Sequence, residues 1–138
     1  MTVRQYMKKN VVSLPSTATL LEAARTMKEK HIGSMIIEDN LKVKGLLTDR
    51  DIALAVAAAG KDPTSTCVCD IMIQAPVTVD ADTDINAALR IMNRASVGRL
   101  PVLENGKLIG VISDADIAGA MKEEISQFME LEERYTRA

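Results

Sequence analysis

The chain has 138 residues, of which 47% are apolar, 26% charged and 2% aromatic, and its formal net charge is −2. This balance argues against a nucleic-acid-binding protein, whose surface would be basic. No apolar run approaches the ~18 residues of a membrane span, and the first residues lack the apolar stretch of a signal peptide. We therefore expect a cytoplasmic protein with no membrane partner.

Residues 1–60 predict one structural unit. Short β-branched runs bounded by polar residues indicate strands, and apolar residues at helical spacing after Thr19 indicate a capped helix. In chain order, the predicted elements are a strand at 11–14, a helix through Leu20, Ala23, Ala24 and Met27, a hairpin of strands at 34–38 and 43–48, and a helix at 52–59.

Residues 61–66 contain the breaker-rich stretch of the chain and predict a linker, and residues 67–121 then predict the same elements again. Asn105-Gly106 is a strong hairpin signal because both residues tolerate positive φ. In chain order, the predicted elements are a strand at 77–79, a helix through Ile85, Ala88, Leu89 and Met92, strands at 100–103 and 108–113, and a helix at 117–121.

Residues 122–138 predict a helical tail, because Ile125, Phe128 and Met129 give it one apolar face. Most such tails lie on their own domain. The alternative is a helix that binds a partner or a second copy of the chain, and we expect a homodimer.

The two units are copies of one another, since adding 65 to many residue numbers reaches the same residue type. A repeat of this kind fixes the architecture before any motif is interpreted, and units of about 60 residues are near the lower limit for independent stability. The sequence predicts an α+β protein of two β-α-β-β-α repeats related by pseudo-twofold symmetry, with a C-terminal helical extension. The matched residues include Met7/Met72, Val12/Val77, Met27/Met92, Gly33/Gly98, Gly45/Gly110, Asp49/Asp114, Asp51/Asp116 and Ile52/Ile117.

Glycines recur at two matched places. Gly33 and Gly98 are predicted to end the first helix of each unit in the left-handed region. Gly45 and Gly110 lack a side chain, so another group can approach the backbone closely there.

The sequence offers no catalytic or metal-binding set. A structural zinc site needs about four ligands, whereas Cys67, Cys69 and His31 are the only cysteines and histidine. We interpret both cysteines as reduced structural thiols, because residues two apart face different ways in a helix. His31, at a helix end, is expected to be solvated or to cap the helix.

The highest concentration of matched polar residues lies where a strand runs into the last helix of each unit. There, a hydroxyl and the free N–H groups of the first helical turn can bind a phosphate, and the aspartate three positions later can bind a ribose diol. The candidate residues are Thr48, Asp49, Arg50 and Asp51 in the first copy and Ser113, Asp114 and Asp116 in the second.

A purely structural interpretation competes with this one. Thr48 with Asp51, and Ser113 with Asp116, approximate a capping box that needs no ligand. The two copies also differ in charge, because Ala115 stands where the first copy has Arg50, and Arg99 is the nearest substitute. We therefore expect the two sites to bind unequally.

The doubled β-α-β-β-α unit, with glycine, two apolar residues, Thr or Ser, two further residues and Asp, resembles the cystathionine-beta-synthase (CBS) domain, here as a tandem pair. The resemblance covers the chain from about residue 2 to residue 121 and implies clefts between the units that bind AMP, ADP, ATP or S-adenosylmethionine. It implies phosphate contacts from Thr48 and Ser113 and ribose contacts from Asp51 and Asp116. It also implies an adenine wall formed by Val12, Ser13, Met35 and Ile36 in one copy and Val77, Thr78, Leu100 and Pro101 in the other.

We accordingly expect a regulatory module that senses an adenosine-containing ligand and signals to an effector protein, with no required cofactor. The alternative is a ligand-independent dimerisation or assembly module. An enzyme is not expected, since paired carboxylates alone do not make a reaction.

Overall fold

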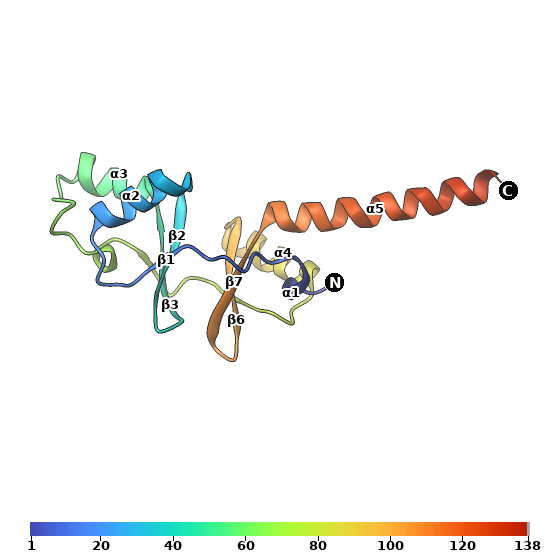
Figure 1. Cartoon of the computed structure of the whole chain (residues 1–138), viewed down its shortest axis with the longest axis horizontal. Coiled ribbons are helices and arrows are strands. Elements are labelled where there is room, and N and C mark those ends of the chain that lie inside the picture. Colours follow the sequence, from blue (N-terminus) through green and yellow to red (C-terminus); the bar gives the residue numbers. More distant parts are fainter. Residues whose placement is uncertain (138) are drawn as a thin grey trace.

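The structure, a computed structural model, describes residues 1–137 and contains two similar units side by side (Figure 1). It confirms the predicted α+β class and the order of elements. The first half contains α1 (Val3–Tyr6), β1 (Ser13–Leu14), α2 (Leu20–Lys30), β2 (Ser34–Asp39), β3 (Lys42–Thr48), α3 (Asp49–Ala53) and the π-helical turn η1 (Leu54–Ala58). The second half contains the 3₁₀ turn η2 (Val68–Asp70), β4 (Ile73–Gln74), β5 (Val79–Asp80), α4 (Ile85–Ala95), β6 (Arg99–Glu104), β7 (Lys107–Ser113) and α5 (Asp114–Arg137).

Each unit is built on a small mixed sheet. The strand orders are β1-β2-β3-β4 and β5-β6-β7, with a parallel pair (β1 with β2, β5 with β6) beside the predicted antiparallel hairpin. In the second hairpin, Asn105 and Gly106 adopt φ of 52° and 77°, as a tight turn requires. β1 and β5 are shorter than predicted, since Val12 and Val77 lie outside them.

The first helices of the two units begin as predicted but do not end at glycine. Thr19 accepts a hydrogen bond from Glu22 N, and Asp84 accepts one from Asn86 N. The left-handed residues that close these helices are His31 and Ser96, both at φ 54°, so the assignment of this role to Gly33 and Gly98 was wrong. His31 does act as a helix cap.

The segments that precede β1 and β5 are exchanged between the units. Val3 is fully buried in the core of the second unit, where Tyr6 and Met7 also pack. Val68 is fully buried in the core of the first unit, together with Ile71 and Met72. We call residues 1–9 and 66–74 the leader segments, and Figure 1 shows the chain passing twice between the units near them. Each unit therefore depends on residues from the other half of the chain.

This exchange explains the matched glycines of β3 and β7. A Cβ on Gly45 would lie 2.5 Å from Met72 Sδ and 2.9 Å from the Ile73 carbonyl oxygen. A Cβ on Gly110 would lie 2.7 Å from Met7 Sδ and 2.9 Å from the Lys8 carbonyl oxygen. Another group does approach these glycines closely, as expected, but it is a leader segment.

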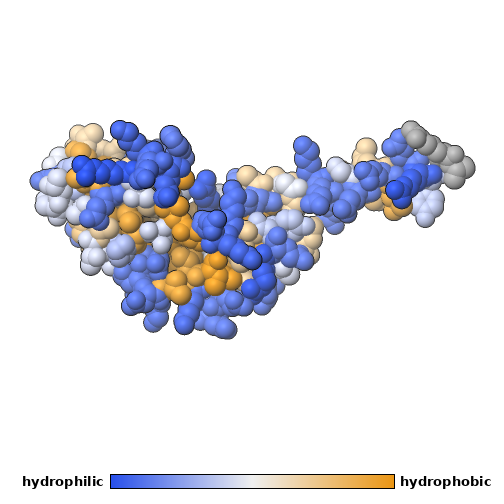
Figure 2. Space-filling model, viewed as in Figure 1, coloured by the Kyte–Doolittle hydropathy of each residue, from blue (hydrophilic) through white to orange (hydrophobic). Residues whose placement is uncertain are grey.

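The outer faces of the two hairpins lie toward each other. Leu108 N donates to the carbonyl oxygen of Leu41 over 2.8 Å, which joins the two hairpins directly. Figure 2 shows apolar side chains gathered between the units, over β3 and β7. The pair of units is thus held by apolar packing and by the leader segments.

The C-terminal helix is continuous from the second unit into the predicted tail. Its first turns pack through the buried Ile117 and Ala120, whereas residues 122–136 are all exposed. In Figure 1, α5 projects away from the rest of the molecule. Within the described residues, no helix combines the length and apolar character needed to cross a membrane.

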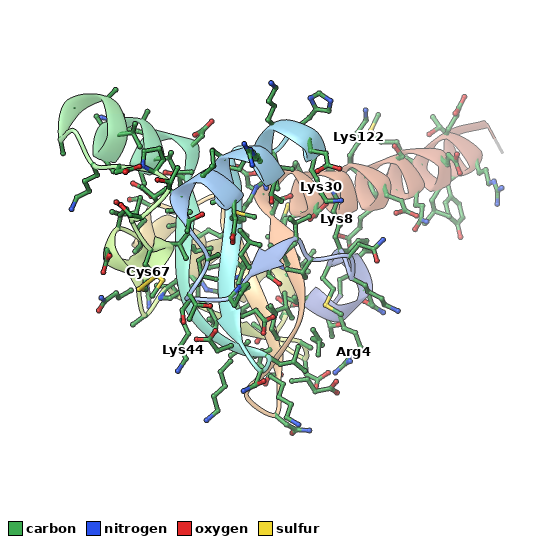
Figure 3. The ribbon with its side chains drawn as sticks, turned by 60° about the vertical axis from the view of Figure 1, so that its left-hand side comes forward. Arg4, Lys8, Lys30, Lys44, Cys67 and Lys122 are labelled. Atoms are coloured by element: carbon green, nitrogen blue, oxygen red, sulfur yellow. A yellow bond between two sulfur atoms is a disulfide. The ribbon has the colours of Figure 1, made fainter. Side chains whose placement is uncertain are left out.

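Cys67 and Cys69 form a disulfide (Figure 3), so the expectation of reduced thiols was wrong. The segment is neither a regular helix nor a strand. Cys67 is extended and caps η2, whose tight turn brings Cys69 back toward it, with the two Cα atoms 5.2 Å apart.

Candidate functional site

The strand-to-helix junctions of the two units have the same geometry. Thr48 N donates to Asp51 Oδ2 over 3.1 Å, and Asp51 N donates to Thr48 Oγ1 over 3.1 Å. Ser113 N donates to Asp116 Oδ2 over 2.9 Å, and Asp116 N donates to Ser113 Oγ over 3.1 Å. Both junctions are therefore complete capping boxes.

The first-turn N–H groups are not free, which corrects the expectation that they form an anion site. Asp49 N donates to the carbonyl oxygen of Gly33, and Asp114 N donates to that of Gly98, each over 2.9 Å. The next N–H in each helix donates to the carboxylate of Asp49 or Asp114 over 2.8 Å. An anion at either junction must therefore be bound mainly by side chains.

The same carboxylates explain why residues 33 and 98 are glycines. A Cβ on Gly33 would lie 3.2 Å from Asp49 Oδ2, and one on Gly98 would lie 3.3 Å from Asp114 Oδ2. Asp49 and Asp114 are thus packed against the start of the neighbouring strand. These two aspartates therefore have a structural role at the junction.

The hydroxyl and carboxylate groups of the capping boxes can each make further hydrogen bonds. A hydroxyl that accepts one hydrogen bond still has its own proton to donate, and a carboxylate has about four acceptor positions. The box uses Oδ2 of Asp51 and of Asp116, so Oδ1 of each remains for another donor. All four side chains of the two boxes are partly exposed. A capping box and a ligand site are therefore compatible here.

The predicted adenine wall is only partly at the surface. Met35 and Leu100 are buried in the cores of their own units, so their side chains face away from the junctions. Pro101 is also buried, whereas Val12, Ser13 and Thr78 are partly exposed and Val77 is exposed. Ser13 pairs with Ile36 across the parallel strands, but Ile36 is buried as well.

Arg99 links the two junctions. It lies opposite Ser113 in the β6–β7 pair, and its Nη1 donates to Ser34 Oγ over 3.3 Å. Ser34 lies opposite Thr48 in the β2–β3 pair. Because Ser34 and Arg99 are equivalent positions of the repeat, their contact marks the pseudo-twofold axis. Arg50, in contrast, is exposed beside the first junction.

Lys8 was missed by the sequence analysis. Its Nζ lies 3.9 Å from Asp116 Oδ1, which places a cation at the second junction. The repeat gave a signal that could have been used, because the position equivalent to Lys8 is Ile73. That signal falls outside the glycine, hydroxyl and aspartate motif.

One pocket, of about 420 Å³, opens at the other end of β2. Of the predicted site residues it contains Ser13, and it is acidic because Glu38 and Asp39 line it. Hydrogen bonds from the Ser16 side chain and backbone hold the pKa of Asp39 below its ordinary value of 3.8. Among residues 1–137, no group of three or more His, Cys, Asp or Glu side chains is placed to hold a metal ion.

Comparisons with known proteins identify the fold. The family model described as "CBS domain" matches residues 3–58 and 68–123. Hypoxic response protein 1 of Mycobacterium tuberculosis is 35% identical over 130 residues, covering 93% of this chain and 91% of that protein. The CBS domain-containing protein YhcV of Bacillus subtilis is 31% identical over 116 residues, covering 84% and 82%.

Solved structures with the same fold include CBS proteins. The crystal structure of Hypoxic Response Protein I with two coordinated zinc ions has a TM-score of 0.78 at 36% identity, covering 86% of this chain and 97% of that one. The CBS domain pair of protein MJ0100, in complex with 5′-methylthioadenosine and S-adenosyl-L-methionine, shares the fold with a TM-score of 0.76 at 21% identity, covering 90% and 98%. The chain therefore belongs to the CBS domain family, as a tandem pair of CBS domains.

Proposed function

We propose that this CBS pair is a regulatory module that binds an adenosine-containing ligand between its two units and signals to an effector protein. The observation that carries the proposal is the duplicated junction, in which a hydroxyl and a carboxylate are held in place and keep unused hydrogen-bonding capacity. CBS pairs of this kind are typically non-catalytic, and the chain is not an enzyme.

Several features support binding between the units. The hydroxyl residues Thr48 and Ser113 lie opposite Ser34 and Arg99, and Arg99 bridges from one unit to the other. A ligand that contacts residues of both units binds best when they have one particular relative orientation, and so it shifts the population toward that orientation. Such a shift can alter a surface that an effector recognises.

A thermal melt with a panel of adenosyl compounds tests the proposal. A ligand that binds only the folded state, present at one hundred times its dissociation constant, stabilises it by about 2.7 kcal/mol. The panel should contain AMP, ADP, ATP, NAD and S-adenosylmethionine, together with 5′-methylthioadenosine, because a CBS pair of the same fold binds the last two. A melting temperature that none of these compounds changes would contradict the proposal.

Single variants then assign the sites. Asp51→Ala and Asp116→Ala each remove one proposed ribose contact, so each should weaken binding at its own junction. Asp84→Ala is the matched control, since it also removes a carboxylate that accepts a backbone N–H at the start of a helix, but that helix is α4. A ribose ligand that binds Asp51→Ala and Asp116→Ala as tightly as the wild type would show that these roles are wrong.

A second function, assembly, is favoured by the exposed part of α5. Met121, Ile125 and Phe128 follow the 4-3 spacing of a coiled-coil seam, which continues through Glu132 to Tyr135. Ile125, Phe128 and Tyr135 are 60%, 62% and 76% exposed. Most of the stability of a helix in a protein comes from packing of its apolar face, and residues 122–136 of α5 are exposed. A homodimer that pairs two such helices would bury this apolar face, and a CBS-CP12 protein of 31% identity is described as hexameric.

The assembly function is tested by the mass of the protein in solution. Ending the chain after Met121 should convert a dimer into a monomer, and Phe128→Glu should do the same by placing charge in the seam. Ser126→Glu is the matched control because it adds the same charge outside the spaced apolar positions. An oligomeric state that both changes leave intact would remove α5 from the interface.

A further inference from the structure

The exchange of leader segments places different side chains at equivalent points beside the two junctions. Lys8 pairs with Val111 through two backbone hydrogen bonds of 2.9 and 3.0 Å, and Ile73 pairs with Leu46 in the equivalent ladder. The backbone is thus duplicated at this point. The side chain is a cation in the second unit and an exposed apolar group in the first.

Lys8 lies on the same face of its sheet as the hydroxyl of the second junction. Residues directly opposite each other in an antiparallel pair present their side chains to one face, as do residues two apart along a strand. Lys8 is opposite Val111, Ser113 is two residues further along β7, and Arg99 is opposite Ser113. Lys8 and Arg99 therefore flank Ser113 on the face that is turned away from the core.

The ion pair between Lys8 and Asp116 does little to stabilise the fold. The nitrogen and oxygen are 3.9 Å apart, and the lysine side chain is 73% exposed whereas the Asp116 side chain is 15% exposed. An ion pair this long, with its lysine largely in solvent, contributes little to stability. The ammonium is consequently free to leave Asp116 for an anion that binds beside it (Figure 3 labels Lys8 near the start of α5).

An anion at this junction needs such a cation. The N–H groups of Asp114, Ala115 and Asp116 already donate to protein oxygens, and the two carboxylates of this turn repel negative charge. Ala115 supplies no charge where the first unit has Arg50. Lys8 and Arg99 are the cationic side chains that these contacts and pairings place around Ser113.

We propose that Lys8 is a specificity-determining residue of the second site, where its ammonium binds the phosphate of a phosphorylated adenosine ligand whose ribose is held by Asp116. This inference rests on the proposed function and narrows it to one ligand class at one site. The leader segment of one half of the chain thereby sets the selectivity of the site in the other half.

Binding of AMP and adenosine, which differ only by the phosphate, tests the inference by isothermal titration calorimetry. The titrations use full-length protein carrying Asp51→Ala, so that the second site is measured. Lys8→Met should weaken AMP binding about tenfold, as expected for loss of a charge-assisted hydrogen bond, and should leave adenosine binding within about twofold. Lys9→Met, which removes the neighbouring exposed charge, is the matched control and should change neither.

A second experiment asks whether a lysine at the equivalent position, residue 73, makes the first site bind phosphate. In a protein carrying Asp116→Ala, Ile73→Lys should increase the affinity for AMP severalfold over that for adenosine. Melting curves of Lys8→Met and Ile73→Lys without ligand should match those of their parents, because both positions are exposed.

The outcomes separate this inference from the proposed function. If adenosine and AMP bind with equal affinity, or if Lys8→Met weakens both equally, the role of Lys8 is wrong while ligand sensing stands. If neither adenosine nor any compound of the adenosyl panel binds the wild-type chain, both proposals are wrong.

Discussion

The two junctions of this CBS pair are almost the same in backbone and different in charge. The hydrogen bond from the hydroxyl residue's N–H to the aspartate is 3.1 Å in the first unit and 2.9 Å in the second. Around this common frame, Arg50 and Ile73 stand in the first unit where Ala115 and Lys8 stand in the second. The comparison teaches that the contacts which hold the fold are duplicated, whereas the side chains beside them have diverged.

The cores test how far the duplication extends. Leu47 and Ile112 are equivalent positions and both are fully buried. Leu47→Ala and Ile112→Ala should each lower the free energy of unfolding by roughly 2–5 kcal/mol, measured by urea denaturation. Because each core contains a leader segment from the other half, we expect one cooperative transition in both variants. Two separate transitions would show that the units unfold independently.

The matched glycines test the leader contacts. Gly45→Ala and Gly110→Ala force a Cβ to within 3 Å of a methionine sulfur and a backbone oxygen, so each should destabilise the fold by about 1–3 kcal/mol. Gly119→Ala is the control, since nothing lies near its Cβ and α5 should gain roughly 0.5–1 kcal/mol. A loss in only one of the two glycine variants would break the equivalence of the units.

Removing each capping hydroxyl measures how much the two junctions contribute to stability when no ligand is bound. Thr48→Ala and Ser113→Ala each remove the side chain that accepts from an aspartate N–H, and each should cost about 1 kcal/mol. The loss is measured by thermal or urea denaturation of the ligand-free protein. A loss near zero at one junction would mean that its hydroxyl is kept for a ligand alone.

The smallest expected effect concerns a carboxylate that differs between the repeats. Asp39 accepts from Ser16, whereas the equivalent Glu104 accepts from Arg4 of a leader segment. The pKa of Asp39 is lowered from 3.8 in the folded state, so its contribution to stability is present above that pH and is lost as the pH falls through the lower, folded-state pKa.

Urea denaturation from pH 6 to pH 2 measures this contribution. The difference in stability between the wild type and Asp39→Asn should be constant down to about pH 4 and shrink below it. Ser16→Ala should reduce this pH dependence, because it removes the hydroxyl whose hydrogen bond is the largest cause of the lowered pKa, while the backbone N–H of residue 16 still donates to Asp39. A difference that does not depend on pH would contradict the assignment.

The elements could be predicted because their signals are local. Helical spacing after Thr19 and Asp84, and the Asn105-Gly106 turn, depend on residues close together in the chain, and the structure contains the helices and the hairpin. Gly33 and Gly98 were misassigned because a nearby glycine is only a statistical sign of a helix end. The prediction of reduced cysteines failed because it assumed a regular element where the chain makes a tight turn.

The sites could be predicted only in part. The hydroxyl and aspartate positions could be proposed as site residues because the repeat keeps them and because their hydrogen bonds span three residues, and their ligand-binding role stays a prediction. Lys8 and the buried orientation of Met35 and Leu100 could not be found in this way. They depend on which sheet a segment joins and which face of a strand meets the core.

The sequence by itself determined two copies of one α+β unit, because a repeat at a fixed offset and local hydrophobic periodicity survive without any knowledge of long-range contacts. Only the tertiary structure decided that each leader segment packs on the opposite unit, since a short segment carries no local signal for its distant partner. That choice places Met72 over Gly45, Met7 over Gly110 and Lys8 beside Asp116. The fold is therefore encoded within each repeat. The exchange between the units adds Lys8 against Ile73 to the difference between the two junctions that Arg50 and Ala115 already make.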